Sequence, residues 1–380
     1  MNIYLYLKHF PSYGDDLNEG TRKAVHGFAS GLAACGTDVT VLCEAAERSS
    51  FQAEAGYQIE CFSNRQERPS FALSTELKHY IRDFITTIDL VILNGIFHPS
   101  VYAMSRTLKR YRIPYIAAPH DPYHPTIFQK NAHLKLPYWH LLEKHVLKQA
   151  TAIQALDNRH ATYLRDRQIS TPVIGIPNGY SPEDVHDESL LHWPPQGTAH
   201  LCFLGRLDAH NKGLDLLLDA FAEITDSYDV KLTLQGPDCG DRAALEKQVA
   251  QLKLTEKVQI LKPNYARSPA SIIADHDIFC LPSRFEGFSL AALEAMLAGR
   301  VILISEIAGL TPYIEASGCG TVVSPEIASI QKGLIDLLQR RSEWKEMGLR
   351  GRHYALKHLH WHEIAASALK QYEQLIPRAM

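Results

Sequence analysis

The chain has 380 residues, a formal net charge of −3, 46% hydrophobic residues and 21% charged residues. These proportions are those of an ordinary water-soluble globular protein, and the length exceeds the usual size of one hydrophobic core, so we expect two domains. No apolar run approaches the about 18 residues of a membrane-spanning helix, which excludes a spanning segment. We also expect no nucleic-acid partner.

The cysteines and the first residues indicate the cytoplasm. The seven cysteines are odd in number and widely spread, which favours neither a disulfide framework nor a zinc site. Residues 1–8 are typical of a first buried strand and are too short for a secretory signal. The tightest histidine cluster, at residues 358, 360 and 362, is more typical of a surface than of a metal site. We therefore expect no metal and no bound cofactor.

The first part of the chain alternates strands with helices, which predicts parallel βαβ units and ligand sites beyond the carboxyl ends of the strands. A helix is expected over residues 20–35. The predicted strands are 3–7, 38–43, 89–93, 115–118, 152–155 and 173–176. Together they form an expected first domain over residues 1–185, with the function of binding an acceptor.

Residues 177–200 are rich in proline, glycine and acids, which is the composition of a linker. A second doubly wound domain is expected over 186–360, with an open cleft between the domains as the ligand site. Residues 361–380 are expected to form a terminal helix that packs back on the first domain. The predicted strands of the second domain are 200–204, 231–235, 258–261, 277–281 and 300–304, and its predicted helices include 215–224 and 242–252.

The segment from Arg106 to Lys148 is locally basic, with eight lysines or arginines against two acids. Its helical part, residues 136–148, also carries large apolar side chains, a pattern compatible with peripheral contact with an anionic membrane surface. A core helix with a solvated basic face has the same composition, and that interpretation is the favoured one.

The loop after the first predicted strand lacks a G-x-G-x-x-G, because Gly14 and Gly20 are too far apart for the dinucleotide fingerprint. This argues against a nicotinamide cofactor. The loop still leads into a helix start at Gly20, where a phosphate can approach closely because glycine has no side chain.

The stretch 282–299 reads as the end of a buried strand, a turn that contains Gly287, and a helix that ends at Gly299. Glu286 is expected in the turn, and Glu294 one to two turns inside the helix. Free N–H groups near the helix start, between two carboxylates, suit a ligand with hydroxyls on both sides of an anionic group, as in a nucleotide sugar. A solvated helix with two exposed acids is an equally good interpretation of this stretch alone.

A second loop, Gly205 to Lys212, follows the first strand of the second domain. Arg206 and Lys212 stand six residues apart, so they can flank an anion: arginine offers a planar fork and lysine a mobile point charge. Taken alone, the pair is more typical of an ordinary surface loop.

Several motifs in one order resemble the retaining GT-B glycosyltransferases of family 4. They are G-R-L…K-G-L at 205–214, I-P-N-G-Y at 176–180, P-H-D at 119–121, E-G-F at 286–288 with a second glutamate eight positions after the first, and S-G-C-G-T-V-V-S-P at 317–325. The resemblance covers nearly the whole chain. It implies a fold of two Rossmann-like α/β domains.

The resemblance also implies roles for individual residues. Arg206 and Lys212 would bind the donor diphosphate and stabilise its growing charge. Glu294 would bind the ribose hydroxyls, Glu286 the hydroxyls of the donor sugar, and His120 would contact the sugar from the first domain. The remaining expected donor contacts are Gly14, Gly20, Gly205, Gly287, Phe288, Ser289 and Leu290, with the N–H groups around Ser289 and Leu290 on a phosphate.

Retention of configuration proceeds either through a carboxylate nucleophile or by front-face attack, in which the leaving phosphate takes the proton of the acceptor. Because Glu286 matches a hydroxyl binder, the family pattern favours front-face attack without a metal. The sequence departs from the family at Ser289, Ala291 and Val301, where glycine or proline is frequent. These departures bear on the identity of the transferred sugar.

The sequence thus predicts a metal-independent retaining hexosyltransferase, with UDP-glucose as the preferred donor and a glycan or lipid-linked saccharide as the acceptor, in polysaccharide biosynthesis. The expected location is the cytoplasm or the inner face of a membrane. Two alternatives are a nucleotide-sugar epimerase of the same fold and a two-domain sugar-binding protein without catalysis.

Overall fold

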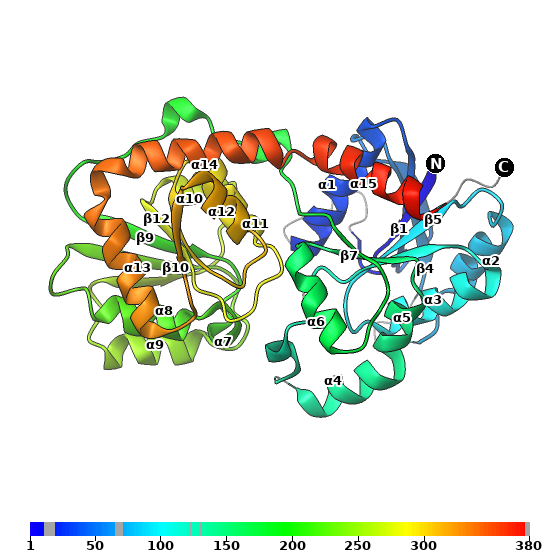
Figure 1. Ribbon diagram of the computed structural model, residues 1–380, viewed down its shortest axis with the longest axis horizontal. Coiled ribbons are helices and arrows are strands. Elements are labelled where there is room, and N and C mark those ends of the chain that lie inside the picture. The colour runs from blue at the N-terminus through cyan, green and yellow to red at the C-terminus, as the bar shows by residue number, and fades with distance from the viewer. Residues whose placement is uncertain (11–19, 65–70, 122, 130, 377–380) are drawn as a thin grey trace. The chain divides into compact units, whose positions relative to one another are not determined.

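A computed structural model of the chain describes residues 1–10, 20–64, 71–121, 123–129 and 131–376. The chain divides into two compact units (Figure 1). The first unit contains Met1–Gly179 and Trp361–Met380, and the second contains Tyr180–His360. Each unit is an α/β domain built on one sheet, so the predicted fold class of two parallel-sheet domains is confirmed.

The sheet of the first unit has eight strands in the order β3-β4-β2-β1-β5-β6-β7-β8, and all neighbours are parallel except β3 and β4. The chain moves outward from β1 in one direction and then continues from β5 in the other, so the order reverses between β1 and β5. The apolar sequences of β1 and β5 suit strands that helices cover on both faces. The strands are β1 (Asn2–Tyr6), β2 (Asp38–Ala45), β3 (Ser49–Gln52), β4 (Gln58–Ser63), β5 (Leu90–Asn94), β6 (Tyr115–Ala118), β7 (Ala152–Ala155) and β8 (Val173–Gly175).

The terminal helix α15 (Trp361–Leu375) packs against α1 (Gly20–Ala34) in the first unit (Figure 1). Two glycines make this approach possible, because a Cβ atom at Gly27 or Gly31 would overlap Trp361. The other helices of this unit are α2 (Thr75–Asp83), α3 (Pro99–Tyr111), α4 (Ala132–Tyr138), α5 (Lys144–Gln149) and α6 (Ala161–Asp166), with the π-helical turn η2 (Trp139–Glu143) joining α4 to α5 and 3-10 turns at Pro125–Phe128 and Asn158–His160.

The sheet of the second unit is wholly parallel, with the strand order β11-β10-β9-β12-β13-β14. Here the order reverses between β9 and β12. The strands are β9 (Ala199–Leu204), β10 (Val230–Gln235), β11 (Val258–Leu261), β12 (Ile278–Leu281), β13 (Val301–Ser305) and β14 (Gly320–Val323).

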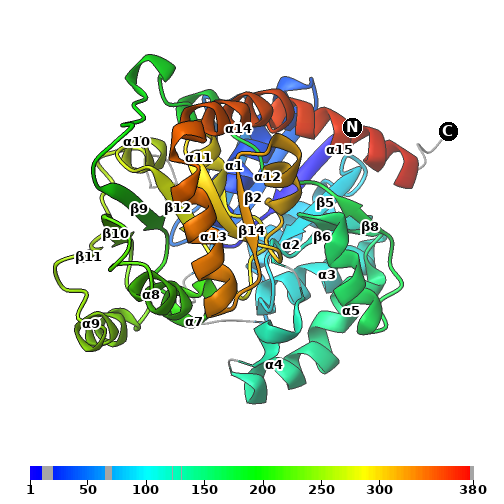
Figure 2. The same cartoon turned by 60° about the vertical axis from the view of Figure 1, so that its left-hand side comes forward.

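Helices cover both faces of the second sheet, with α8, α9 and α13 on one face and α10, α11, α12 and α14 on the other (Figure 2). This arrangement buries the central strands β12 and β13 on both sides, as their continuous apolar sequences require. The helices are α7 (Ala209–Lys212), α8 (Leu214–Ala222), α9 (Arg242–Gln251), α10 (Pro269–Ala274), α11 (Leu290–Leu297), α12 (Thr311–Ser317), α13 (Ile327–Gln339) and α14 (Trp344–His358), with 3-10 turns at Pro182–Asp184, Glu188–Leu190 and Arg341–Glu343.

The proline-rich segment before β9 is fastened to the second unit by three arginines. Arg300 is fully buried and donates to the carbonyl oxygen of His192 at 2.7 Å. Arg352 donates to the carbonyl of His186 at 2.7 Å, and Arg341 binds three carbonyls in 194–197. Charge-assisted hydrogen bonds of this kind are stronger than neutral ones. The segment is therefore an ordered part of the domain, although its composition is that of a linker.

Candidate functional site

The reversal of strand order between β9 and β12 places two loops side by side at the carboxyl edge of the second sheet. One loop follows β9 and contains Gly205 and Lys212, and the other follows β12 and contains Glu286. In open parallel sheets the point where the strand order reverses is the usual place for a ligand. The two motifs that the sequence singled out thus meet at this edge.

The loop after β9 turns sharply and closes into a short helix. Asp208 caps α7 by accepting a hydrogen bond from the backbone N–H of Asn211 at 3.2 Å. Gly213, which ends α7, has a φ of +66°, and a Cβ atom there would lie 2.2 Å from the carbonyl oxygen of Pro282. Only glycine permits both the left-handed backbone and this close approach of the two loops.

The loop after β12 runs from Pro282 to Ser289 without regular structure, and Glu286 lies within it, as expected. Ser289 is the N-cap of α11, and its hydroxyl accepts a hydrogen bond from the N–H of Ala292 at 3.2 Å. Glu294 lies in the second turn of this helix and is buried. The side chain that replaces a frequent glycine at position 289 therefore starts the helix, because serine is a good N-cap residue.

An ion pair joins the two loops. The Nζ atom of Lys212 lies 2.5 Å from Oε2 of Glu286, and both side chains are largely buried, at 16% and 10% exposure. The hydroxyl of Ser283 donates to the same carboxylate oxygen at 3.4 Å. Because two buried charges must compensate each other, this contact fixes the position of both loops.

A second ion pair, between the loop after β12 and helix α8, supports the loop that carries Glu286. Arg284 makes a bidentate contact with Asp215 at the start of α8, with two N–O distances of 2.7 Å. Its guanidinium also donates to the carbonyl oxygen of His210 at 2.9 Å. Two parallel hydrogen bonds from a planar guanidinium restrict orientation as well as distance. Arg284 and Asp215 therefore hold the loop that carries Glu286 against the loop that carries Lys212.

Arg206 differs from Lys212 in its surroundings. Its side chain is exposed and has no hydrogen bond or ion pair with any other residue in the described part of the chain. It follows Gly205, whose carbonyl oxygen lies so close to Gly236 that a Cβ atom on Gly236 would stand 1.9 Å from it. The site thus has one cation held in a buried pair and one cation facing water.

In the first unit, His120 follows β6 and has a left-handed backbone, with a φ of +63°. Its Nε2 atom lies 2.8 Å from Oδ1 of Asn94, at the carboxyl end of β5. Withdrawal from water lowers the pKa of His120 to about 4. Gly20 is the first residue of α1, and Gly14 lies outside the described residues.

Four features of these sites were not identified from the sequence: the Arg284–Asp215 pair, the contact of Ser283 with Glu286, the close approach at Gly213, and Asn94. A glycine directly after Lys212 is a weak signal of a tight turn. The other three depend on contacts between residues far apart in the chain, and no spacing in the sequence indicates them.

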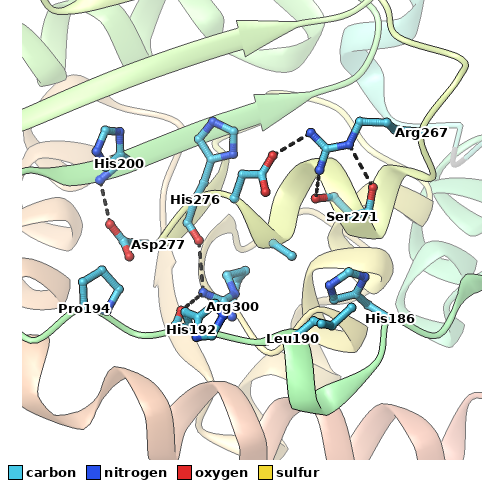
Figure 3. Close-up of a pocket in the computed structure, with 12 residues that line it drawn as sticks. His186, Leu190, His192, Pro194, His200, Arg267, Ser271, His276, Asp277 and Arg300 are labelled. Atoms are coloured by element: carbon cyan, nitrogen blue, oxygen red, sulfur yellow. Dashed lines mark hydrogen bonds and ion pairs between the residues drawn. The ribbon is translucent and has the colours of Figure 1, made fainter.

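A cavity of about 450 Å³ lies at the opposite, amino-terminal edge of the second sheet (Figure 3). Its lining includes Arg300 and four histidines, His186, His192, His200 and His276. Because His200 is the second residue of β9 and Arg300 precedes β13, this cavity is separate from the loops at the carboxyl edge. Within the described ranges no group of three or more histidine, cysteine or acidic side chains is placed to hold a metal ion.

Two family models match this chain in succession. The Glycosyltransferase Family 4 model matches residues 19–184, and the model for Glycosyl transferases group 1 matches residues 193–354. Each model thus corresponds to one of the two units.

Relatives with known names are similar over part of their length. An MMP alpha-(1->4)-mannosyltransferase from Mycolicibacterium hassiacum is 30% identical over 207 residues, which are 52% of this chain and 50% of the relative. A phosphatidyl-myo-inositol mannosyltransferase from Mycobacterium leprae is 26% identical over 208 residues, or 54% of each chain. The chain therefore spans about half the length of the curated relatives it matches.

Solved structures share the fold over the full length. Sucrose-phosphate synthase from Thermosynechococcus elongatus superposes with a TM-score of 0.77 at 19% identity, with 100% of both chains covered. Anabaena HepE, solved in complex with UDP and glucose, superposes with a TM-score of 0.74 at 16% identity, with 98% of this chain and 100% of HepE covered.

Proposed function

Because this chain belongs to the group 1, family 4-like glycosyltransferases and has the two-domain GT-B fold, we propose that it transfers a hexose from a nucleotide sugar to a glycan or lipid-linked saccharide. The observation that carries the proposal is the Lys212–Glu286 pair, 2.5 Å apart at the carboxyl edge of the second sheet. It brings a cation and a hydroxyl-binding carboxylate together where a sugar diphosphate needs both.

The two cations have separate tasks in this proposal. Lys212 comes from a largely buried position and supplies positive charge in a place where water screens it little. Arg206 is exposed and offers a fork of N–H groups to the phosphate oxygens. Together they stabilise the negative charge that develops on the diphosphate as the bond to the sugar breaks.

The two carboxylates bind hydroxyls at opposite ends of the donor. Glu286 accepts hydrogen bonds from the transferred sugar, and Glu294 accepts them from the ribose. The start of α11 lies between them in sequence, and its first N–H groups attract a phosphate. In this arrangement Ser289 serves as both the helix cap and a neighbour of the phosphate.

The chemistry we propose is front-face attack with retention of configuration. Glu286 is held by Lys212 and Ser283, so it is positioned as a binding group rather than as a free nucleophile. The leaving phosphate oxygen then takes the proton of the acceptor hydroxyl as the new bond to the anomeric carbon forms. The cations supply the charge stabilisation, and no metal ion is required.

The donor we propose is UDP-glucose, as the resemblance of the motifs implies. The similarity to Anabaena HepE, which was solved in complex with UDP and glucose, supports this donor. The named relatives from Mycolicibacterium hassiacum and Mycobacterium leprae are mannosyltransferases, which makes a mannose donor the main competitor.

Calorimetric titration of the full chain with UDP-, GDP- and ADP-sugars tests this assignment. We expect binding of UDP-glucose and its loss in Arg206→Ala, with Lys247→Ala, an exposed lysine of α9, as the control. Tighter binding of a GDP-sugar than of UDP-glucose would refute UDP-glucose as the donor. Failure to bind any of the sugars would refute the proposed function.

A second part of the proposal concerns the surface formed by α4, η2 and α5, which we name the leucine surface. Leu134, Leu136 and Leu141 are 63%, 43% and 67% exposed. Lysines and histidines stand among them, and the one acid of residues 131–149, Glu143, is buried. Exposed apolar side chains with surrounding positive charge suit an anionic lipid surface that carries the acceptor.

Vesicle flotation of the full chain tests the leucine surface. We expect flotation with vesicles of phosphatidylcholine and phosphatidylglycerol, and its loss in a Leu134→Ser, Leu141→Ser double variant. Leu261→Ser is the matched control, because Leu261 is 40% exposed in the second unit. Failure of the unmodified chain to float would refute membrane contact. No helix of the described residues is long and apolar enough to span a bilayer.

A further inference from the structure

Asn94 is a buried asparagine, 4% exposed, at the carboxyl end of β5. It lies where the strand order of the first sheet reverses, since β5 is paired with β1 on one side and β6 on the other. Its side-chain amide contacts β1, β5 and the residues that follow β6. Nδ2 donates to the carbonyl oxygen of Tyr6 at 3.2 Å and to that of Ile92 at 3.3 Å, and Oδ1 faces Nε2 of His120 at 2.8 Å.

These contacts determine the orientation of the amide. If the group were reversed, its oxygen would stand against the two carbonyl oxygens of Tyr6 and Ile92, which is unfavourable because none of the three carries a hydrogen. Oδ1 must therefore face the imidazole and accept a hydrogen bond from it. It follows that Nε2 of His120 carries the proton.

A neutral imidazole has one N–H donor and one acceptor nitrogen. With the proton on Nε2, the Nδ1 atom of His120 is the acceptor. Desolvation holds the pKa of His120 at about 4, so the ring is neutral at physiological pH. His120 can thus accept a hydrogen bond through Nδ1, but it offers no positive charge to an anion.

The backbone around His120 gives a second, independent sign of a constrained site. His120 has a φ of +63°, and Gly95, which follows Asn94, has a φ of +115° and donates its N–H to the carbonyl of Ala118 at 3.0 Å. Left-handed backbone at a residue other than glycine is uncommon and is found at functional sites held by their surroundings. Here the end of β6 is tied to the loop after β5.

We propose that Asn94 is a positioning residue that holds His120 as the Nε2–H tautomer, so that Nδ1 accepts a hydrogen bond from a substrate hydroxyl. The inference rests on the proposed function only in naming a sugar as the source of that hydroxyl. A hydroxyl donates to a neutral acceptor nitrogen, whereas a phosphate oxygen has no hydrogen to donate and is repelled by the lone pair. The edge of the first sheet is therefore selective for hydroxyls.

The tautomer is measured directly by long-range proton–nitrogen NMR of the full chain labelled with ¹⁵N-histidine. The His120 signals are those that disappear in His120→Gln. We expect one neutral form with the proton on Nε2 and no titration between pH 5.5 and 8. A proton on Nδ1, or titration near the ordinary value of 6.5, would overturn the proposal.

A substitution at Asn94 extends the test. Asn94→Leu removes the acceptor and keeps the branching of the side chain at Cγ, so we expect a mixture of both neutral tautomers. The control is Asn264→Leu, an exposed asparagine of the second unit. A His120 tautomer unchanged in Asn94→Leu would refute the positioning role, and the spectrum of the unsubstituted chain decides the tautomer even if this variant fails to fold.

Kinetics separate this inference from the proposed function. We expect Asn94→Leu to lower kcat/KM about tenfold, and to lower it no further in a chain that already carries His120→Ala, because the two residues act as one unit. Additive effects would argue against positioning. The NMR measurement needs no substrate, so the expected tautomer in a chain without transferase activity would reject the proposed function and leave the role of Asn94 intact.

Discussion

The two sheets both reverse their strand order once, yet the residues at these two points differ in kind. In the second unit the point between β9 and β12 carries charges, Lys212 and Glu286 in an ion pair and Arg206 facing water. In the first unit the point between β1 and β5 carries a neutral amide and a neutral imidazole, Asn94 and His120. One edge is suited to an anion and the other to hydroxyls, although each lies where the order of parallel strands reverses.

The comparison teaches that a shared fold places a site without deciding its chemistry. Parallel strands provide the same edge in both units, and the side chains on the loops determine what binds there. Ion pairs are sensitive to the loss of a charge, while the neutral pair is sensitive to a gain of charge.

Removing the buried cation should break the charged edge. Lys212→Ala is expected to lower turnover by about 10²-fold or more, the scale of losing one group that stabilises charge in the transition state. Steady-state transfer of the hexose measures it, with Lys247→Ala as the control, because Lys247 is exposed on α9. Unchanged turnover in Lys212→Ala would remove the proposed role of this residue.

The first unit, whose sheet edge carries the neutral Asn94–His120 pair, also contains a buried acid, Glu143. Titration of Glu143 should change the stability of this unit. Glu143, in the π-helical turn, accepts hydrogen bonds from the hydroxyl of Tyr123 at 2.6 Å and from the N–H of Phe97 at 3.3 Å. Burial raises the pKa of Glu143 from 4.5 to about 7. The folded state therefore holds its proton more tightly than the unfolded state does.

Because the pKa of Glu143 is higher in the folded state, its contribution to stability is greatest below pH 4.5 and is lost as pH rises toward 7. The free energy of unfolding should fall by about 2 kcal/mol between pH 5.5 and 8 through this group. Urea denaturation at several pH values measures the change, and Glu143→Gln should flatten it. An equal slope in Glu143→Gln would show that Glu143 does not titrate in this range.

The support beneath the charged edge should matter less than the charges themselves. Arg284→Ala removes the bidentate contact with Asp215, which is partly exposed, so we expect a loss of about 1 kcal/mol in stability. We also expect KM for the nucleotide sugar to rise while kcat changes little, because Glu286 loses its support and Lys212 remains. Arg82→Ala, which removes an exposed ion pair with Asp83 at the end of α2, is the control. A drop in kcat as large as that of Lys212→Ala would contradict this ranking.

The smallest expected effect is that of a chelator. If the two cations supply the charge stabilisation, hexose transfer should continue undiminished in excess EDTA. Activity that disappears with EDTA and returns with added Mg²⁺ or Mn²⁺ would refute metal independence and would assign part of the charge stabilisation to a metal ion.

Much of the fold could be predicted from the sequence, because buried parallel strands are short apolar runs between helices. The strands and helices around Lys212 and Glu286 follow this pattern. The hairpin β3–β4 was not predicted, since Ser49–Gln52 is an exposed, largely polar edge strand without the alternation of a half-buried strand. The segment before β9 has the composition of a linker, but arginines from distant parts of the chain fasten it to the domain.

The sequence by itself determined most of the alternating strands and helices, the family, and the residues that carry charge at the edge of the second sheet. These properties reside in periodicity and in short motifs, which neighbouring residues specify. Only the tertiary structure decided that Lys212 lies 2.5 Å from Glu286 and that Asn94 orients His120. It alone also decided that the backbone of Pro282 approaches Gly213 closely. Residues far apart in the chain meet there because parallel strands align their carboxyl ends, and no local pattern records which side chains will then be in contact.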